Sequence, residues 1–237
     1  MGILVNYLAD ILPFKRTLGT PVCDKCGNTL PVFSYFIWKQ KCPVCGQTHF
    51  LRKWLVNIFF ILASLWLYLS PLSRLQITPG LVLLAFFGVV TVIDIEHRVI
   101  LHPVSIVGAL LGLFFGVWKH GWIITLLGGA AGYFSMLGLY YFGILVVRLR
   151  AKRYSALTEQ EALGFGDVNL GGVIGLMLGW PAVWLGLFIG ILTAGVVSFF
   201  YILVMLFKQR YDANLAIPYG PFLIFGAVVI MFIRWLI

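Results

Sequence analysis

Two aspartates stand where long apolar stretches of the chain end or begin. Asp94 closes the apolar run from Leu81 to Ile93, and Asp167 opens another apolar stretch. A carboxylate placed partly within a membrane costs up to about 3 kcal/mol, so such residues usually mark a functional site. Two carboxyl groups in one site do not easily both ionise. One ionised group beside one protonated group is the state that aspartyl proteolysis requires, so the pair indicates a protease centre.

In that chemistry, the ionised aspartate takes a proton from a water that attacks the scissile carbonyl, while its partner donates to the carbonyl oxygen. Simpler roles also exist, because Asp94 is spaced to pair with Arg98 and Asp167 to cap a helix. Gly164 and Gly166 precede Asp167 and leave no side chain beside its carboxyl group. We therefore expect an extended substrate backbone to approach Asp167 there.

Four cysteines form the second group that could do chemistry. Cys23 and Cys26 make one C-x-x-C pair and Cys42 and Cys45 another, with fifteen residues between the pairs and a glycine after each. This spacing is typical of two tight turns around one tetrahedral Zn²⁺, with disulfides or redox chemistry as the alternatives. Four thiolates leave no open position for water, so the zinc is expected to be structural. The nearby His49 is interpreted as a surface residue.

The elements that must position these residues are apolar. Of 237 residues, 61% are hydrophobic and 11% charged, against roughly 25% charged in an ordinary soluble domain. Long apolar runs separated by charged, Pro-bearing or Gly-bearing breaks predict an all-α polytopic membrane protein with about seven transmembrane helices. The predicted spans are 54–70, 79–95, 102–118, 122–147, 167–179, 183–206 and 218–237. The fifth is short, and its end falls near the turn Gly179-Trp180-Pro181.

Three parts follow from this division: an N-terminal interfacial segment or remnant of a span over 1–14, a zinc-binding domain over 15–53, and the helical bundle over 54–237. Residues 1–14 lack a basic leader and include Asp10, so no cleavable signal peptide is expected. With residues 1–53 in the cytosol, 14 of the 17 basic residues lie on the cytosolic side. The basic residues that give the net charge of +9 then act as an insertion signal and attract the anionic headgroups of the lipid bilayer. No nucleic-acid partner is needed to explain this charge.

The same topology brings Asp94 and Asp167 to one depth near the cytosolic membrane face. Gly171, Gly175 and Gly179 recur every four residues, a pattern that favours tight helix packing. The remaining acidic residues fall in aqueous segments and are interpreted as solvated charges. They are Asp10, Asp24, Glu96, Glu159, Glu161 and Asp212.

Together these motifs resemble the type IV prepilin peptidases, a family of membrane aspartyl proteases with a G-x-G-D motif. Gly164-Phe165-Gly166-Asp167 matches that motif, and Asp94 and the paired cysteines occur in the family's order. Pro218-Tyr219-Gly220-Pro221 is similar to the segment that opens the family's last span. The resemblance covers nearly the whole chain.

The resemblance implies a protease of the bacterial inner membrane that removes the basic leader of prepilins and pilin-like secretion proteins at the cytosolic face. It implies that Asp94 and Asp167 are the catalytic pair, and that the zinc ligands are the four cysteines. Basic leader residues could meet Glu96, Glu159 or Glu161. Many members then methylate the new N-terminus with S-adenosylmethionine, and for this chain methylation is carried only as what the family implies.

Two features depart from the family pattern. The span that usually precedes the cysteine domain is represented only by 2–13, and Leu101-His102-Pro103 comes later after Asp94 than the usual pair. Two other classes remain open: a signal-peptide-peptidase type of G-x-G-D protease, and a transporter or assembly factor whose aspartates bind cations or protons. The cysteines count against the former, and the absence of internal repeats in the sequence counts against the latter.

Overall fold

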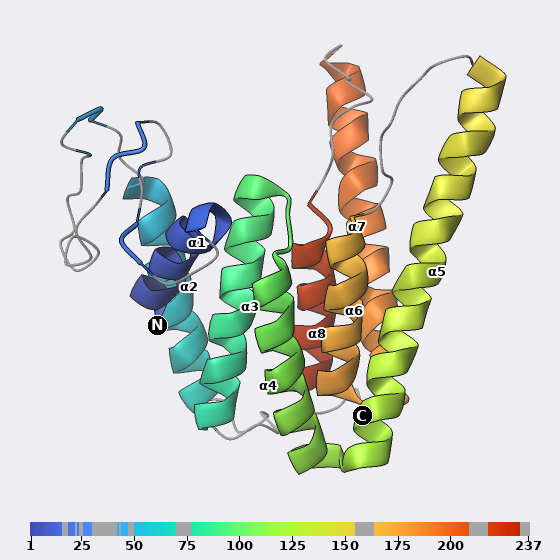
Figure 1. Ribbon diagram of the computed structural model, residues 1–237, viewed down its shortest axis with the longest axis horizontal. Helices are drawn as coiled ribbons and strands as arrows, with labels where there is room; N and C mark the ends of the chain where they lie inside the picture. The colour runs from blue at the N-terminus through green and yellow to red at the C-terminus, as the bar shows by residue number, and fades with distance from the viewer. Residues whose placement is uncertain are drawn as a thin grey trace. The chain divides into compact units, whose positions relative to one another are not determined.

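The computed structural model describes residues 1–15, 19–21, 23, 26–29, 42, 44–46, 50–69, 77–154, 164–208 and 218–232. Every regular element within these ranges is a helix, as the apolar runs predict (Figure 1). The helices form two compact units, Met1–His97 and Arg98–Ile237. The first two long apolar helices group with the N-terminal helix, and the division predicted at residues 14 and 53 stays a prediction.

The first unit contains three helices: α1 (Gly2–Lys15), α2 (Phe50–Leu69) and α3 (Ile77–His97). α1 packs against both α2 and α3. The contact with α2 is close, since a Cβ atom added to Gly2 would lie 2.3 Å from Asn57 Oδ1. α3 likewise approaches α2 through Gly88, where an added Cβ would lie 2.3 Å from Phe60 Cζ.

The second unit contains α4 (His102–His120), α5 (Trp122–Tyr154), α6 (Phe165–Leu178), α7 (Ala182–Phe207) and α8 (Gly220–Phe232). α6 is its central helix and packs against the other four. Gly179, with φ 73°, ends α6 in a left-handed conformation that glycine adopts without strain, at the turn that the sequence predicts.

Glycines let α5 and α6 meet backbone to backbone. A Cβ added to Gly132 would lie 2.2 Å from Gly171 O, and one added to Gly128 would lie 2.4 Å from Gly175 O. Only the missing side chains permit this approach. The predicted role of Gly171 and Gly175 in tight packing is therefore confirmed.

Five of the described helices contain stretches long and apolar enough to cross a membrane. They are Leu51–Leu69, Thr78–His97, His102–His120, Trp122–Leu149 and Ala182–Phe207. Three apolar stretches are shorter: Gly2–Pro13, Phe165–Leu178 and Gly220–Met231. Each of the seven predicted spans overlaps one helix from α2 to α8, while the number that cross the bilayer stays a prediction.

Candidate functional site

Asp94 lies in the last turn of α3 and is 5% exposed. Val90 and Ile93 of the same helix are also buried. The chain leaves α3 at Arg98, whose φ of 54° is in the left-handed region. The helix therefore stops one turn after Asp94, and Asp94 is held at a helix end, as the sequence predicts.

Asp167 is the third residue of α6 and is 8% exposed. Its backbone N–H donates to Gly164 O at 3.0 Å, which closes the first turn of the helix. The helix N-terminus carries a partial positive charge, so a carboxylate is favourable there. Most residues that follow in α6 are buried, so this carboxyl group sits at the start of the most enclosed helix of the unit.

The two glycines before Asp167 have different surroundings. A Cβ added to Gly164 would lie 3.6 Å from Asp167 Oδ2, so this glycine places no side chain of its own against the carboxylate. A Cβ added to Gly166 would lie 2.8 Å from Ile100 Cβ. The structure thus gives Gly166 a packing contact with the segment before α4, which the sequence does not reveal.

Tyr219, which the sequence analysis names only as part of the Pro-and-Gly segment 218–221, is a further residue near Asp167. It precedes α8, and its C=O accepts a hydrogen bond from the Phe222 N–H at 3.1 Å. Asp167 lies near enough to the Tyr219 hydroxyl group to act on it electrostatically. The Pro-and-Gly segment that opens α8 is therefore part of the surroundings of Asp167, because α8 packs against α6.

An ion-pair cluster joins the three helices of the first unit. Arg52 of α2 donates through Nη1 to both carboxylate oxygens of Glu96, at 3.0 and 2.7 Å, and through Nη2 to Asp10 Oδ1. Asp10 is 7% exposed, so its interpretation as a solvated charge is wrong. Glu96 is more exposed but is also paired. The sequence separations of 42 and 44 residues give no local signal for this cluster.

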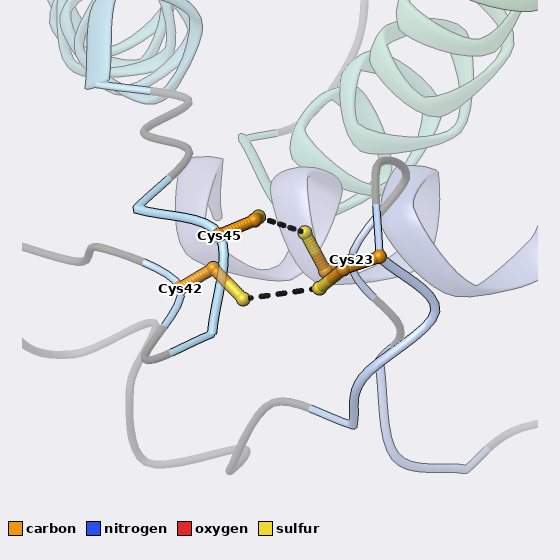
Figure 2. Close-up of side chains that lie close together, drawn as sticks. Cys23, Cys42 and Cys45 are labelled. Carbon is orange, nitrogen blue, oxygen red and sulfur yellow. Dashed lines mark hydrogen bonds between the residues drawn. The ribbon is translucent and has the colours of Figure 1, made fainter.

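The four cysteines come together as predicted. Cys23 and Cys45 have sulfur atoms 3.5 Å apart, and those of Cys26 and Cys42 are 3.4 Å apart. Figure 2 shows the sulfur atoms of Cys42 and Cys45 on the side that faces Cys23, and a dashed line joins the sulfur atoms of Cys23 and Cys45. The N–H of Gly27 donates to Cys23 O and that of Gly46 to Cys42 O, both at 2.9 Å.

Each pair is therefore a tight turn closed by a glycine. Gly27 has a φ of 70° and Gly46 a φ of 67°, in the left-handed region where glycine is favoured. In such a turn, backbone N–H groups of Cys45 and then Val44 donate to the Cys42 sulfur and lower its pKa to about 6. A lower pKa favours the thiolate, which is the form that binds a metal.

The arrangement fits one tetrahedral metal ion. A zinc–sulfur distance of about 2.3 Å places tetrahedral sulfur ligands roughly 3.8 Å apart, and all four sulfur atoms here lie within 4.8 Å of one another. A disulfide needs about 2.05 Å between sulfur atoms, so the cysteines are free thiols. Zinc held by these four cysteines would have a structural role.

Several predicted residues lie outside the described part of the chain. They are His49, Asp24, Glu159, Glu161 and Asp212. Asp94 and Asp167 belong to different units, Met1–His97 and Arg98–Ile237, and each unit is described by itself. Their joint action as a catalytic pair therefore stays a prediction.

Comparison with known proteins identifies relatives along most of the chain. A prepilin leader peptidase/N-methyltransferase from Pseudomonas putida is 26% identical over 223 residues, which cover 89% of this chain and 70% of the relative. One from Pectobacterium carotovorum is 29% identical over 205 residues, covering 85% and 67%. One from Myxococcus xanthus is 26% identical over 197 residues, covering 77% of this chain and 54% of the relative.

No significant match to a solved structure is found. The sequence model of the type IV leader peptidase family matches residues 81–236, which include both Asp94 and Asp167. This match covers well over half of the chain. The chain belongs to the type IV leader peptidase family.

Proposed function

We propose that this protein is a membrane aspartyl endopeptidase that removes the basic leader of type IV prepilins and pilin-like secretion proteins. The observation that carries the proposal is the burial of Asp94 and Asp167, each at the end of an apolar helix. The names of the relatives supply the substrate class. Ile100 follows Asp94 by six positions in the sequence and packs against Gly166, the residue before Asp167.

In this reaction, one aspartate is ionised and accepts a proton from the attacking water. The other is protonated and donates a hydrogen bond to the carbonyl oxygen of the scissile peptide. The proton then passes to the leaving amine, and the two carboxyl groups exchange roles. Gly164 places no side chain of its own against the Asp167 carboxylate, and the substrate backbone approaches on the side of this glycine.

The lengths of the helices around Asp167 bear on how the substrate reaches it. Tyr140 of α5 contacts Phe165 edge to face, with ring centroids 5.9 Å apart. Tyr140 therefore marks the position along α5 that lies beside the start of α6. The apolar stretch of α5 continues to Leu149, nine residues or about 13 Å further. Figure 1 shows α5 and α7 extending beyond the starts of α6 and α8. A prepilin whose apolar helix lies in the bilayer would bring its leader junction between these longer helices.

The cytosolic placement of the zinc module and the active site follows from the distribution of basic residues and remains part of the proposal. The tetracysteine module would hold one structural zinc ion. This ion would stabilise the module, whose hydrophobic core is too small to support folding by itself. It supplies no group to peptide cleavage.

Methylation has less support from the structure. A cavity of about 480 Å³ between α4, α5 and α6 is bordered by Ser105, Tyr133 and Asn169, but its lining is chiefly apolar. Such a lining does not fit the charged sulfonium and the nucleoside of S-adenosylmethionine. The relatives' names alone suggest that activity.

The test is co-expression of the full chain with a prepilin and measurement of the prepilin mass. Asp94→Asn and Asp167→Asn are each expected to abolish leader removal while the protein still inserts in the membrane. Asp212→Asn, at an acidic residue that the sequence places in an aqueous segment, is the control and should leave processing intact. Full processing by either active-site variant would exclude the two-aspartate mechanism.

A further inference from the structure

The Arg52 cluster lies at the end of α3 that carries Asp94. Glu96 follows Asp94 by two residues, and successive residues of an α-helix are about 100° apart around its axis. The two side chains therefore leave roughly opposite sides of α3. Glu96 meets Arg52 of α2 on one side, which leaves Asp94 directed away from that contact.

The Arg52 side chain links Glu96 of α3 to Asp10 of α1, and we call these three residues the Arg52 clamp. One guanidinium nitrogen, Nη1, donates to both oxygens of Glu96, and the other, Nη2, donates to Asp10 of α1. The Arg52 side chain is 14% exposed and that of Asp10 is 9% exposed. Charge-assisted hydrogen bonds of a planar guanidinium fix the orientation of their partners as well as their distance. A lysine could neutralise the same charges but could not present this fork.

The last turn of a helix is otherwise its least secure part, because its carbonyl groups lack partners within the helix and the end frays. α3 ends at His97, one residue after Glu96. The clamp ties this final turn to two neighbouring helices of the same unit. Loss of the clamp would leave Asp94 on a turn whose backbone is free to open.

We propose that Arg52 is a positioning residue for Asp94: by holding Glu96 against Asp10, it fixes the last turn of α3 in the conformation that catalysis needs. This inference rests on the proposed protease function. Arg52 acts through α3 and has no contact with the reacting atoms in this scheme. A misplacement of a catalytic group by about 1 Å lowers the rate roughly 100-fold, so the effect belongs in kcat.

The test uses the full-length protein in detergent with a synthetic prepilin segment that spans the leader and the start of the apolar helix. Arg52→Lys keeps the charge and is expected to lower kcat by roughly 10- to 100-fold with KM changed by less than about twofold. Lys119→Arg, at an exposed basic residue of α4, is the matched control and should leave both constants unchanged. A raised KM with unchanged kcat would overturn the proposal, because it would indicate contact with substrate.

Two further measurements separate positioning from general instability. Glu96→Gln should lower kcat similarly, and the double variant Arg52→Lys/Glu96→Gln should lower it little further, because both changes release one clamp. Hydrogen exchange of residues 93–97 should become faster in Arg52→Lys, while exchange in the middle of α2 stays unchanged. Additive losses of activity, or unchanged exchange at the end of α3, would refute the clamp.

The exchange measurement does not depend on activity. If the unmodified protein cleaved no prepilin but exchange at 93–97 still increased in Arg52→Lys, the protease proposal would fail and the clamp on α3 would stand. If the protein cleaved prepilin and Arg52→Lys cleaved it at the full rate, the positioning role would fail alone. The two inferences can therefore be refuted separately.

Discussion

Gly132→Ala is expected to destabilise the protein although it adds a single methyl group. The new Cβ would lie 2.2 Å from Gly171 O and 3.2 Å from Gly175 Cα. Both obstacles are backbone atoms, so no side chain can rotate away and α5 and α6 must separate. Overpacking of this kind costs about 1–3 kcal/mol, and we expect the upper part of that range because the contact is backbone to backbone.

Gly138→Ala is the matched control, six residues further along α5. Apart from the local backbone of α5, no atom of the described residues lies within 4 Å of the Cβ it would add, so the substitution brings only the better helix propensity of alanine, about 0.5–1 kcal/mol. The two variants should therefore shift stability in opposite directions. This contrast removes any general effect of replacing glycine by alanine in a membrane helix.

The assay is thermal unfolding of the purified protein in detergent, followed by circular dichroism. For a chain of this size, 1 kcal/mol corresponds to roughly 2–4 °C in Tm, so Gly132→Ala should unfold several degrees below the unmodified protein. Prepilin cleavage should fall with it, because α6 carries Asp167. Equal Tm values for Gly132→Ala and Gly138→Ala would refute the backbone contact between α5 and α6.

Three other variants test different parts of the structure. Cys23→Ser should lower bound zinc from about one ion per chain to well below one, measured by metal analysis, and a metal-free wild-type protein with a folded N-terminal module would contradict the metal site. Gly164→Leu should lower kcat/KM at least roughly 10-fold without lowering Tm, because its side chain would cover Asp167 Oδ2, 3.6 Å from the added Cβ. Gly190→Ala, whose Cβ would lie 2.9 Å from Leu223 Cα, should lower Tm more than Gly195→Ala, whose Cβ would meet nothing within 4 Å in the described part of the chain beyond the backbone of its own helix.

The helices could be predicted from the sequence because an apolar run long enough to enter a bilayer has few other stable conformations. The ends were less predictable. The apolar span 122–147 corresponds to α5, which continues to Tyr154 through several basic residues. Apolarity reports where a chain meets lipid, whereas the helix continues as long as its backbone hydrogen bonds form.

The cysteine site was predictable for a different reason. Its ligands lie in two short local turns, and each turn is closed by the residue after it, Gly27 or Gly46. The spacing of the cysteines along the chain was therefore enough to predict the site. Arg52 and Asp10 come from segments 42 residues apart, and nothing in their neighbourhoods along the chain indicates that they meet. Only the packing of α1 against α2 and α3 brings them together.

The two aspartates are held in place by different physical means. Asp167 stands on α6, whose position depends on glycine contacts in which a methyl group is too large. Asp94 stands on a helix end fastened by the charges of Arg52, Glu96 and Asp10. Variants that add volume at Gly132 should therefore act through Asp167, and variants that change the fork of Arg52 should act through Asp94. Because Gly132 and Arg52 belong to separate units, the effects of their variants on the free energy of unfolding are expected to add, whereas two changes within either contact should not.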